Sequence, residues 1–188
     1  MRNNKYLFLI TLSFFALGLV NIHFALLGLV CMVLPLFLLF RDKRKTWCQG
    51  YCPRASLFTT CGKLKSKDSY KTPMFFIRGN MKWIMLAYFG INLFIITMST
   101  LKVAAGSMPP MNYMRFLLVI PFVGEMPQLI ELGSISPWIT HLSYRFYSMM
   151  MTTTFLGFIL ALIYRPRTWC TICPIATVSD VYINGINK

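Results

Sequence analysis

The sequence predicts an all-α membrane protein with four transmembrane helices arranged in two hairpin-like halves. Three observations lead to this class. The chain of 188 residues is 56% hydrophobic and has a mean hydropathy of +0.59. Its apolar residues are gathered in runs long enough to cross a bilayer. Two cysteine motifs with the same lead-in each follow such a run, one in each half. We expect a single membrane domain over residues 1–188.

The apolar runs define the expected spans. The first run extends from Tyr6 to Phe40, and one helix of that length would overshoot a hydrocarbon core of about 30 Å. A polar break at 21–23 divides this run into two spans joined by a tight turn. The last span ends at Tyr164, and its apolar pattern extends back toward Trp138. The predicted spans are residues 6–21, 24–40, 81–100 and 146–164.

The net charge of +14 is unevenly distributed. Of the 19 lysines and arginines, 16 lie in the N-terminus, in segment 41–82 or in the tail 165–188, and three lie between the third and fourth spans. Basic residues mark the cytoplasmic side of a membrane. We therefore expect both termini, the loop 41–80 and the cysteine motifs on the cytoplasmic side of the inner membrane, with segment 101–145 outside. Topology explains the charge without a nucleic-acid partner, while an acidic soluble electron carrier remains a possible partner.

The outer segment is not simply polar. Met114 to Ile120 is apolar, too short to cross a membrane and flanked by prolines, and we expect an interfacial or re-entrant helix there. This layer either covers a quinone or partner site or caps the bundle. His23 and His141 fall near the same face. They are either ordinary interfacial residues or ligands of haem or quinone.

The two cysteine motifs share one pattern. Residues 41–53 read RDKRKTWCQGYCP, and residues 165–174 read RPRTWCTICP. Both have basic residues, then Thr-Trp-Cys, a short gap and Cys-Pro. Since proline suits the first turn of a helix, we expect a short cytoplasmic helix after each motif. Two copies of one motif suggest a single site assembled from two related halves.

Four cysteines on the cytoplasmic side point to a metal centre. Cytosolic conditions keep thiols reduced, which disfavours disulfides. A four-iron cluster takes four cysteine ligands, although zinc accepts the same set. We predict one [4Fe–4S] cluster bound by Cys48, Cys52, Cys170 and Cys173. Nearby cations lower thiol pKa values and balance the negative charge of such a cluster, and they are Arg41, Lys43, Arg44, Lys45, Arg165 and Arg167.

Other residues near the motifs leave alternatives open. Cys61 follows Cys52 by nine positions; it is an additional ligand, part of a site shared with a partner, or a spare thiol. Cys31 lies inside the second span, where a small apolar role is expected. Trp47 and Trp169 precede the first cysteine of each motif. They suit interfacial anchors and also shields of the cluster against water.

The pairing of Cys48-x-x-x-Cys52-Pro53 with Cys170-x-x-Cys173-Pro174 resembles the membrane 4Fe–4S-binding proteins of the NapH and NosR type. The resemblance implies a subunit of a respiratory complex that passes electrons between the quinone pool, or flavin carriers, and other redox proteins. This chain has two residues rather than three between the cysteines of its second motif. It also lacks the ferredoxin runs that many relatives append, which leaves one cluster.

The predicted function is therefore electron transfer in a membrane redox complex, without catalysis by this chain itself. The cluster would pass single electrons between a redox partner and quinone, flavin or another cluster. A four-span thiol–disulfide oxidoreductase using Cys170 and Cys173 is one alternative. Its disulfide donors would work on the oxidising face, opposite the basic side that carries these cysteines. A non-redox anchor subunit with structural zinc is the other alternative.

Overall fold

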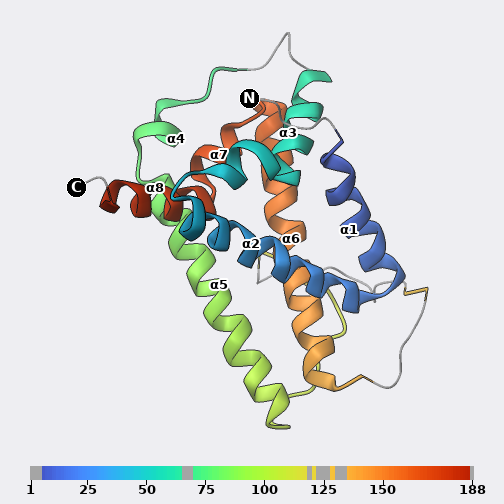
Figure 1. The fold of residues 1–188 in the computed structure, drawn as a ribbon. Helices are drawn as coiled ribbons and strands as arrows, with labels where there is room; N and C mark the ends of the chain where they lie inside the picture. Colours follow the sequence, from blue (N-terminus) through green and yellow to red (C-terminus); the bar gives the residue numbers. More distant parts are fainter. Residues whose placement is uncertain (1–5, 65–69, 118–119, 122–127, 130–134, 187–188) are drawn as a thin grey trace. The chain divides into compact units, whose positions relative to one another are not determined.

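The computed structural model describes residues 6–64, 70–117, 120–121, 128–129 and 135–186, and most of them are helical (Figure 1). The chain divides into two compact units. The first unit comprises Met1–Thr11, Cys31–Phe89 and Thr154–Lys188, and the second comprises Leu12–Val30 and Gly90–Thr153.

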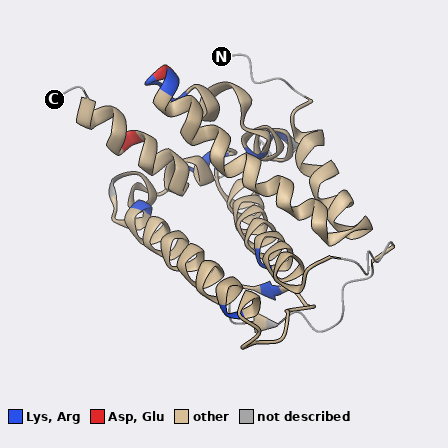
Figure 2. Ribbon diagram, turned by 60° about the horizontal axis from the view of Figure 1, so that its bottom comes forward, with Lys and Arg blue, Asp and Glu red and all other residues tan. Residues whose placement is uncertain are grey.

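Among the residues that the structure describes, three helical stretches are long and apolar enough to cross a membrane. Two are α5 (Met81–Ala104) and α6 (Pro137–Ile163). The third, Ile22–Asp42, combines a 3₁₀ helix, η1 (Ile22–Leu26), with α2 (Leu27–Asp42). The basic residues of α5, Lys82 and Lys102, lie near its two ends, and the stretch between them is uncharged (Figure 2). Membrane association is thus supported by length and composition.

The first predicted span forms a shorter helix. Helix α1 (Phe8–Val20) is apolar but has 13 residues, which is about 20 Å at 1.5 Å per residue. The expected break at Asn21 is confirmed, because Asn21 is extended and its side chain accepts a hydrogen bond from the His23 amide at 2.9 Å. The last long helix, α6, begins at Pro137 rather than at the predicted residue 146, so the helical pattern does extend back to Trp138.

The first unit carries the short helices around the cysteines. After a π-helical turn, η2 (Trp47–Tyr51), come α3 (Pro53–Leu64) and α4 (Met74–Arg78); α7 (Thr168–Ile172) and α8 (Pro174–Ile186) follow α6. Helix α7 contacts both α4 and α8. A Cβ at Gly157 would lie 2.4 Å from the Phe58 ring, so this glycine lets Phe58 lie directly on α6. The apolar core of the unit is Phe58, Ala161, Trp169 and Ile172.

The second unit has its own apolar core. Its buried members are Ile22, Ala25, Met111, Tyr144 and Tyr147. Two short antiparallel strands, β1 (Arg115–Phe116) and β2 (Ile120–Pro121), pair with Phe116 opposite Ile120.

The predicted helix at Met114 to Ile120 is therefore wrong. The amide of Arg115 donates to Ser148 Oγ at 3.1 Å, and the amide of Leu117 donates to Thr152 Oγ1 at 3.4 Å. Leu117 also has a left-handed φ of 52°. Hydroxyl groups on α6 thus satisfy the backbone donors of this segment in its non-helical conformation.

Candidate metal centre

The two cysteine motifs have the same local geometry. The first cysteine of each lies in a short helical turn, Cys48 in η2 and Cys170 in α7. The second cysteine of each follows that turn with extended backbone, Cys52 at ψ 111° and Cys173 at ψ 129°. A proline disfavours the α conformation in the residue before it and fits the first turn of a new helix. Each Cys-Pro pair therefore ends one helix and begins the next.

The backbone hydrogen bonds of the two motifs are also alike. The carbonyl of Cys52 accepts from the Ser56 amide at 3.2 Å, and the carbonyl of Cys173 accepts from the Thr177 amide at 3.0 Å. In both cases the donor lies four residues further along a helix that begins at proline. The prediction of a short helix after each motif is confirmed.

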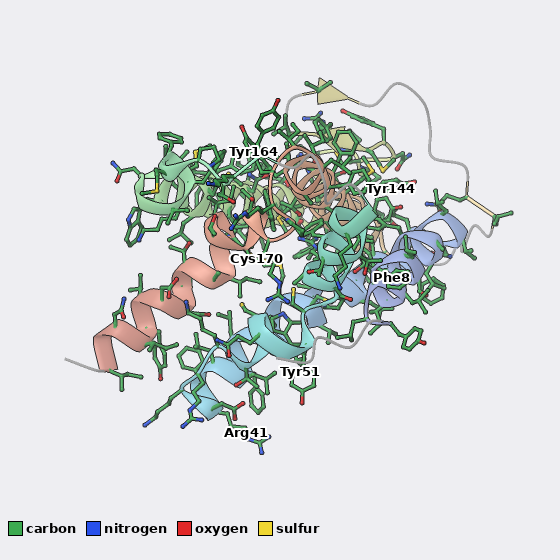
Figure 3. All side chains as sticks on the ribbon, turned by 90° about the horizontal axis from the view of Figure 1, so that it is seen from above. Phe8, Arg41, Tyr51, Tyr144, Tyr164 and Cys170 are labelled. Carbon is green, nitrogen blue, oxygen red and sulfur yellow. The ribbon has the colours of Figure 1, made fainter. Side chains whose placement is uncertain are left out.

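The four motif cysteines lie near one another in the first unit. Cys48 interacts electrostatically with Cys173 and Cys52, and Cys170 interacts with all three others. Figure 3 labels Cys170 and Tyr51, one residue from each motif, and shows sulfur atoms gathered between them. All six cysteines are free thiols. Among the described residues, no three His, Cys, Asp or Glu side chains are grouped as they would be around a single metal ion.

Burial governs the protonation of these thiols. Burial, together with the neighbouring motif cysteines, raises the pKa of Cys48 and of Cys170 from 9.0 to about 12. Burial also raises the pKa of Cys173, although hydrogen bonds from the amides of Ala176 and Ile175 at the start of α8 oppose this. Thiolates rather than thiols bind metals. A bound metal must therefore displace these protons, and the two amides are placed to stabilise the resulting sulfur charge.

Arg54 is a site residue that sequence reasoning missed. It follows Cys52-Pro53 in the first turn of α3, and its guanidinium is enclosed by protein atoms although the residue as a whole is half-buried. Burial lowers the pKa of Arg54, while Cys52, Cys173 and Cys31 counteract that effect. Its position directly after Cys-Pro could have suggested this placement, because the first helical turn lies beside the cysteine.

The predicted basic residues have unequal roles. Lys45 and Arg167 act on Cys48 and Cys170 respectively, lowering the pKa of each thiol against the larger effect of burial. Lys45 also forms an ion pair with Asp180, the acidic residue of α8 (Figure 2). Arg41, in contrast, is exposed and lies 4.0 Å from Asp42. The charge nearest the cysteines therefore comes from Arg54, Lys45 and Arg167 rather than from the whole basic run.

The two tryptophans differ. Trp169 is only 4% exposed and belongs to the core of the first unit, whereas Trp47 is half-buried. Trp169 therefore covers its motif from within the protein instead of anchoring it at an interface.

The two remaining cysteines differ in their relation to the set of four. Cys61 lies on α3, and burial raises its pKa. It is not among the electrostatic partners found for Cys48, Cys170 and Cys173 in the described part of the chain. Cys31, which was expected to be only a small apolar residue, lies within electrostatic range of Arg54 and Cys52.

Both histidines lie in the second unit and use their ring nitrogens in hydrogen bonds. His23 contacts Asn21 Oδ1 at 2.7 Å and Thr140 Oγ1 at 3.2 Å. His141 Nδ1 accepts from the Met111 amide at 3.2 Å, and its Nε2 lies 3.1 Å from Ser99 Oγ. These contacts favour a structural role over the ligation of haem or quinone.

A family model described as a 4Fe-4S binding domain matches residues 24–71 and 147–185. The two matched stretches contain both cysteine motifs, all of α3 and all but the last residue of α8. No curated protein and no solved structure matches the chain significantly. The match supports an iron–sulfur protein with a [4Fe–4S] cluster as its cofactor, in the class of electron-transport proteins with membrane-associated helices.

The residues of the first unit fit such a cluster chemically. Four thiols from two segments supply the number of ligands that a four-iron cluster takes. An enclosed guanidinium and two backbone amides supply positive charge and hydrogen-bond donors around sulfur, which are the features that tune such centres.

Proposed function

We propose that this protein is an electron-transfer subunit of a membrane redox complex, with its [4Fe–4S] cluster held by Cys48, Cys52, Cys170 and Cys173. One observation carries the proposal: cysteines from two distant, similarly folded segments lie within electrostatic range of one another and of an enclosed arginine in one unit. When bound, the cluster supplies a carrier for single electrons. The chain's own residues hold the thiolates, restrict water and offset negative charge.

The extended cysteines before each proline support this assignment. Cys52 and Cys173 precede new helices, whose N-termini carry partial positive charge and favour nearby anions. Trp169 lies in the core beneath the second motif, so the site is dry on that side. Positive charge near a thiolate-ligated cluster favours its more negative, reduced state.

We also propose a four-span topology with both termini and both motifs in the cytoplasm. In the described part of the chain the helices of sufficient length are Ile22–Asp42, α5 and α6, and α1 would have to supply the fourth span. The basic residues concentrated in 41–82 and 165–188 favour the cytoplasmic side. A reporter enzyme that is active only outside the inner membrane should be inactive when fused at the C-terminus. Activity of that fusion would overturn the proposed topology.

Partners follow from the chemistry of a single cluster. A lone one-electron carrier needs a donor and an acceptor close by, so we expect other subunits of the complex, with quinone, flavin or another cluster as the next carrier. Membrane proteins of the NapH and NosR type, which this chain resembles, would have the same arrangement of carriers. An acidic soluble carrier is a suitable partner for the basic loop.

The thiol–disulfide alternative is less well supported by the site. A disulfide-exchange enzyme needs a thiolate as its nucleophile. Burial instead raises the pKa of Cys170 to about 12, so at neutral pH this residue would be protonated unless a metal is bound. Structural zinc would use the same four thiolates, and direct metal analysis separates it from iron.

The decisive experiment is electron paramagnetic resonance on anaerobically purified, dithionite-reduced protein, with iron and zinc assayed on the same sample. We expect a reduced-cluster signal and about four irons per chain. C48S and C170S should both lose the signal. C61S and C31S are matched controls that should retain it. Zinc in place of iron, or a signal that survives both C48S and C170S, would overturn the proposal.

A further inference from the structure

Two arginines of the second unit lie close together without a described acidic partner. Arg115 on β1 and Arg145 on α6 are within electrostatic range of each other. The Nε atoms of both side chains are buried and have no hydrogen-bond partner among the described residues. Like charges with buried, unpaired donors are unfavourable unless an anion neutralises them.

The neighbouring side chains orient this pair but supply no negative charge. The Nη2 atom of Arg115 donates to the Tyr113 hydroxyl at 2.5 Å, and its guanidinium lies 5.2 Å from the centre of the Tyr113 ring. The Arg115 amide donates to Ser148 Oγ at 3.1 Å. These contacts fix one guanidinium without giving its Nε a hydrogen-bond partner.

His141 does not supply the missing charge either. This residue is 2% exposed, and its Nδ1 accepts a hydrogen bond from the Met111 amide. An accepting Nδ1 carries no proton, so the ring is neutral and its Nε2 donates to Ser99. The acids that the structure describes, Asp42 and Asp180, both belong to the first unit. Glu125 and Glu131 lie outside the described residues.

We propose that Arg115 and Arg145 form a binding site for a phosphate group, supplied by a lipid headgroup or by free inorganic phosphate. Paired guanidinium groups bind oxyanions through several charge-assisted hydrogen bonds. Trp138, which is 42% exposed, lies seven residues before Arg145 on α6, or about 10 Å along the axis. Because tryptophan marks the interfacial layer of a membrane, a headgroup phosphate is within reach of this site.

The test uses the purified holoprotein in detergent, stripped of lipid. Its thermal unfolding is followed while phosphatidylglycerol or phosphate-free diacylglycerol is added in mixed micelles. A second arm adds sodium phosphate or sodium chloride at equal ionic strength. We expect stabilisation by phosphatidylglycerol and none by diacylglycerol. Stabilisation by inorganic phosphate as well would identify the free anion as a sufficient ligand, whereas its absence would assign the site to lipid.

Variants separate binding from folding. R115Q and R145Q should each weaken the apparent affinity by about tenfold, the usual effect of losing a charge-assisted hydrogen bond. R145K keeps the charge but loses the planar fork, so it should lie between wild type and R145Q. K102Q removes an exposed charge from the same unit and should leave the affinity unchanged. Equal affinity in wild type and R145Q, or no stabilisation by either phosphate source, would overturn the proposal.

A last variant, E125Q/E131Q, tests whether the protein's own carboxylates neutralise Arg115 and Arg145. If Arg115 and Arg145 bind an external phosphate, the affinity of this variant should stay close to that of wild type. Phosphate binding that appears only in E125Q/E131Q would mean that the protein's own carboxylates occupy the arginines, and it would overturn the proposal.

Discussion

The two cysteine motifs share Thr-Trp-Cys and Cys-Pro but have different surroundings. In the second motif Thr168, Trp169 and Ile172 are all buried, and α7 packs against α4 and α8. In the first motif η2 has no buried residue. Tyr51 between its cysteines is 58% exposed, and a Cβ at Gly50 would meet nothing within 4 Å.

This difference shows that a repeated motif determines the backbone conformation of the cysteines but not the contacts that hold the motif in place. The second motif is held through the core and by the hydroxyl contact between Thr72 and Thr168 at 3.0 Å. The first motif is connected to α8 by the Lys45–Asp180 ion pair, a contact at the surface. We therefore expect the second motif to be preformed and the first to depend more on the bound cluster for its order.

The largest expected effect comes from the two tryptophans. W169A removes a large side chain that is 4% exposed and should lower the free energy of unfolding by about 3–5 kcal/mol. W47A, at a half-buried position, should cost roughly 1 kcal/mol. Chemical unfolding of both variants in detergent measures the difference. Equal losses would mean that both motifs are held equally well by the protein.

Glycine substitutions test the same comparison with smaller expected losses of stability. A Cβ at Gly62 would lie 2.6 Å from Pro166 Cγ, and Pro166 leads into the second motif. G62A should therefore destabilise the protein by about 1–3 kcal/mol through overpacking. G50A, in open space within the first motif, should be neutral or slightly stabilising, since alanine favours helical backbone. Thermal unfolding of the two variants tests this, and a larger loss in G50A would contradict it.

Arg54 joins the two motifs electrostatically, because it interacts with Cys52 and with Cys173. Removing its charge in R54Q should disfavour the reduced cluster, since reduction adds negative charge. A tenfold change in the reduced-to-oxidised ratio corresponds to about 59 mV for one electron, and we expect a shift of that order toward more negative potential. A redox titration followed by paramagnetic resonance measures it. R54K keeps the positive charge, so its reduction potential should stay close to that of wild type.

The matched control for Arg54 is Lys45, which carries the same charge. Its side chain is 30% exposed and is already paired with Asp180, so solvent screens its effect on the cluster. K45Q should shift the potential less than R54Q does. An equal shift in both variants would indicate general charge loss rather than a specific role of the enclosed guanidinium.

Much of the local structure near the cysteines was predictable because proline acts through short-range sterics. Cys52-Pro53 and Cys173-Pro174 each place an extended cysteine before a new helix, as expected from sequence alone. The break at Asn21 was predictable for a similar reason, since its side chain caps the following turn. Iron–sulfur chemistry was also predictable, because it follows from the identity and spacing of the ligands.

Features that depend on long-range contacts were not predictable in the same way. Residues 114–120 looked helical by composition, but hydroxyls on α6 pair with the Arg115 and Leu117 amides. The enclosure of Arg54 and the contrast between Trp47 and Trp169 depend on which elements pack nearby. A short sequence pattern holds no information about those neighbours, so these residues could be recognised only in the folded chain.

The smallest expected effect concerns the surface contact of the first motif. D180N removes the partner of Lys45, and because both side chains are partly exposed, the loss should be about 0.2–1 kcal/mol and should decrease in high salt. D42N is the control, since Asp42 lies 4.0 Å from an exposed Arg41 and six residues before Cys48. If the ion pair helps to hold the first motif in place, D180N should also accelerate loss of the cluster during dilution, whereas D42N should not. Identical rates in the two variants would show that the protein core and the cluster alone are sufficient to hold the first motif.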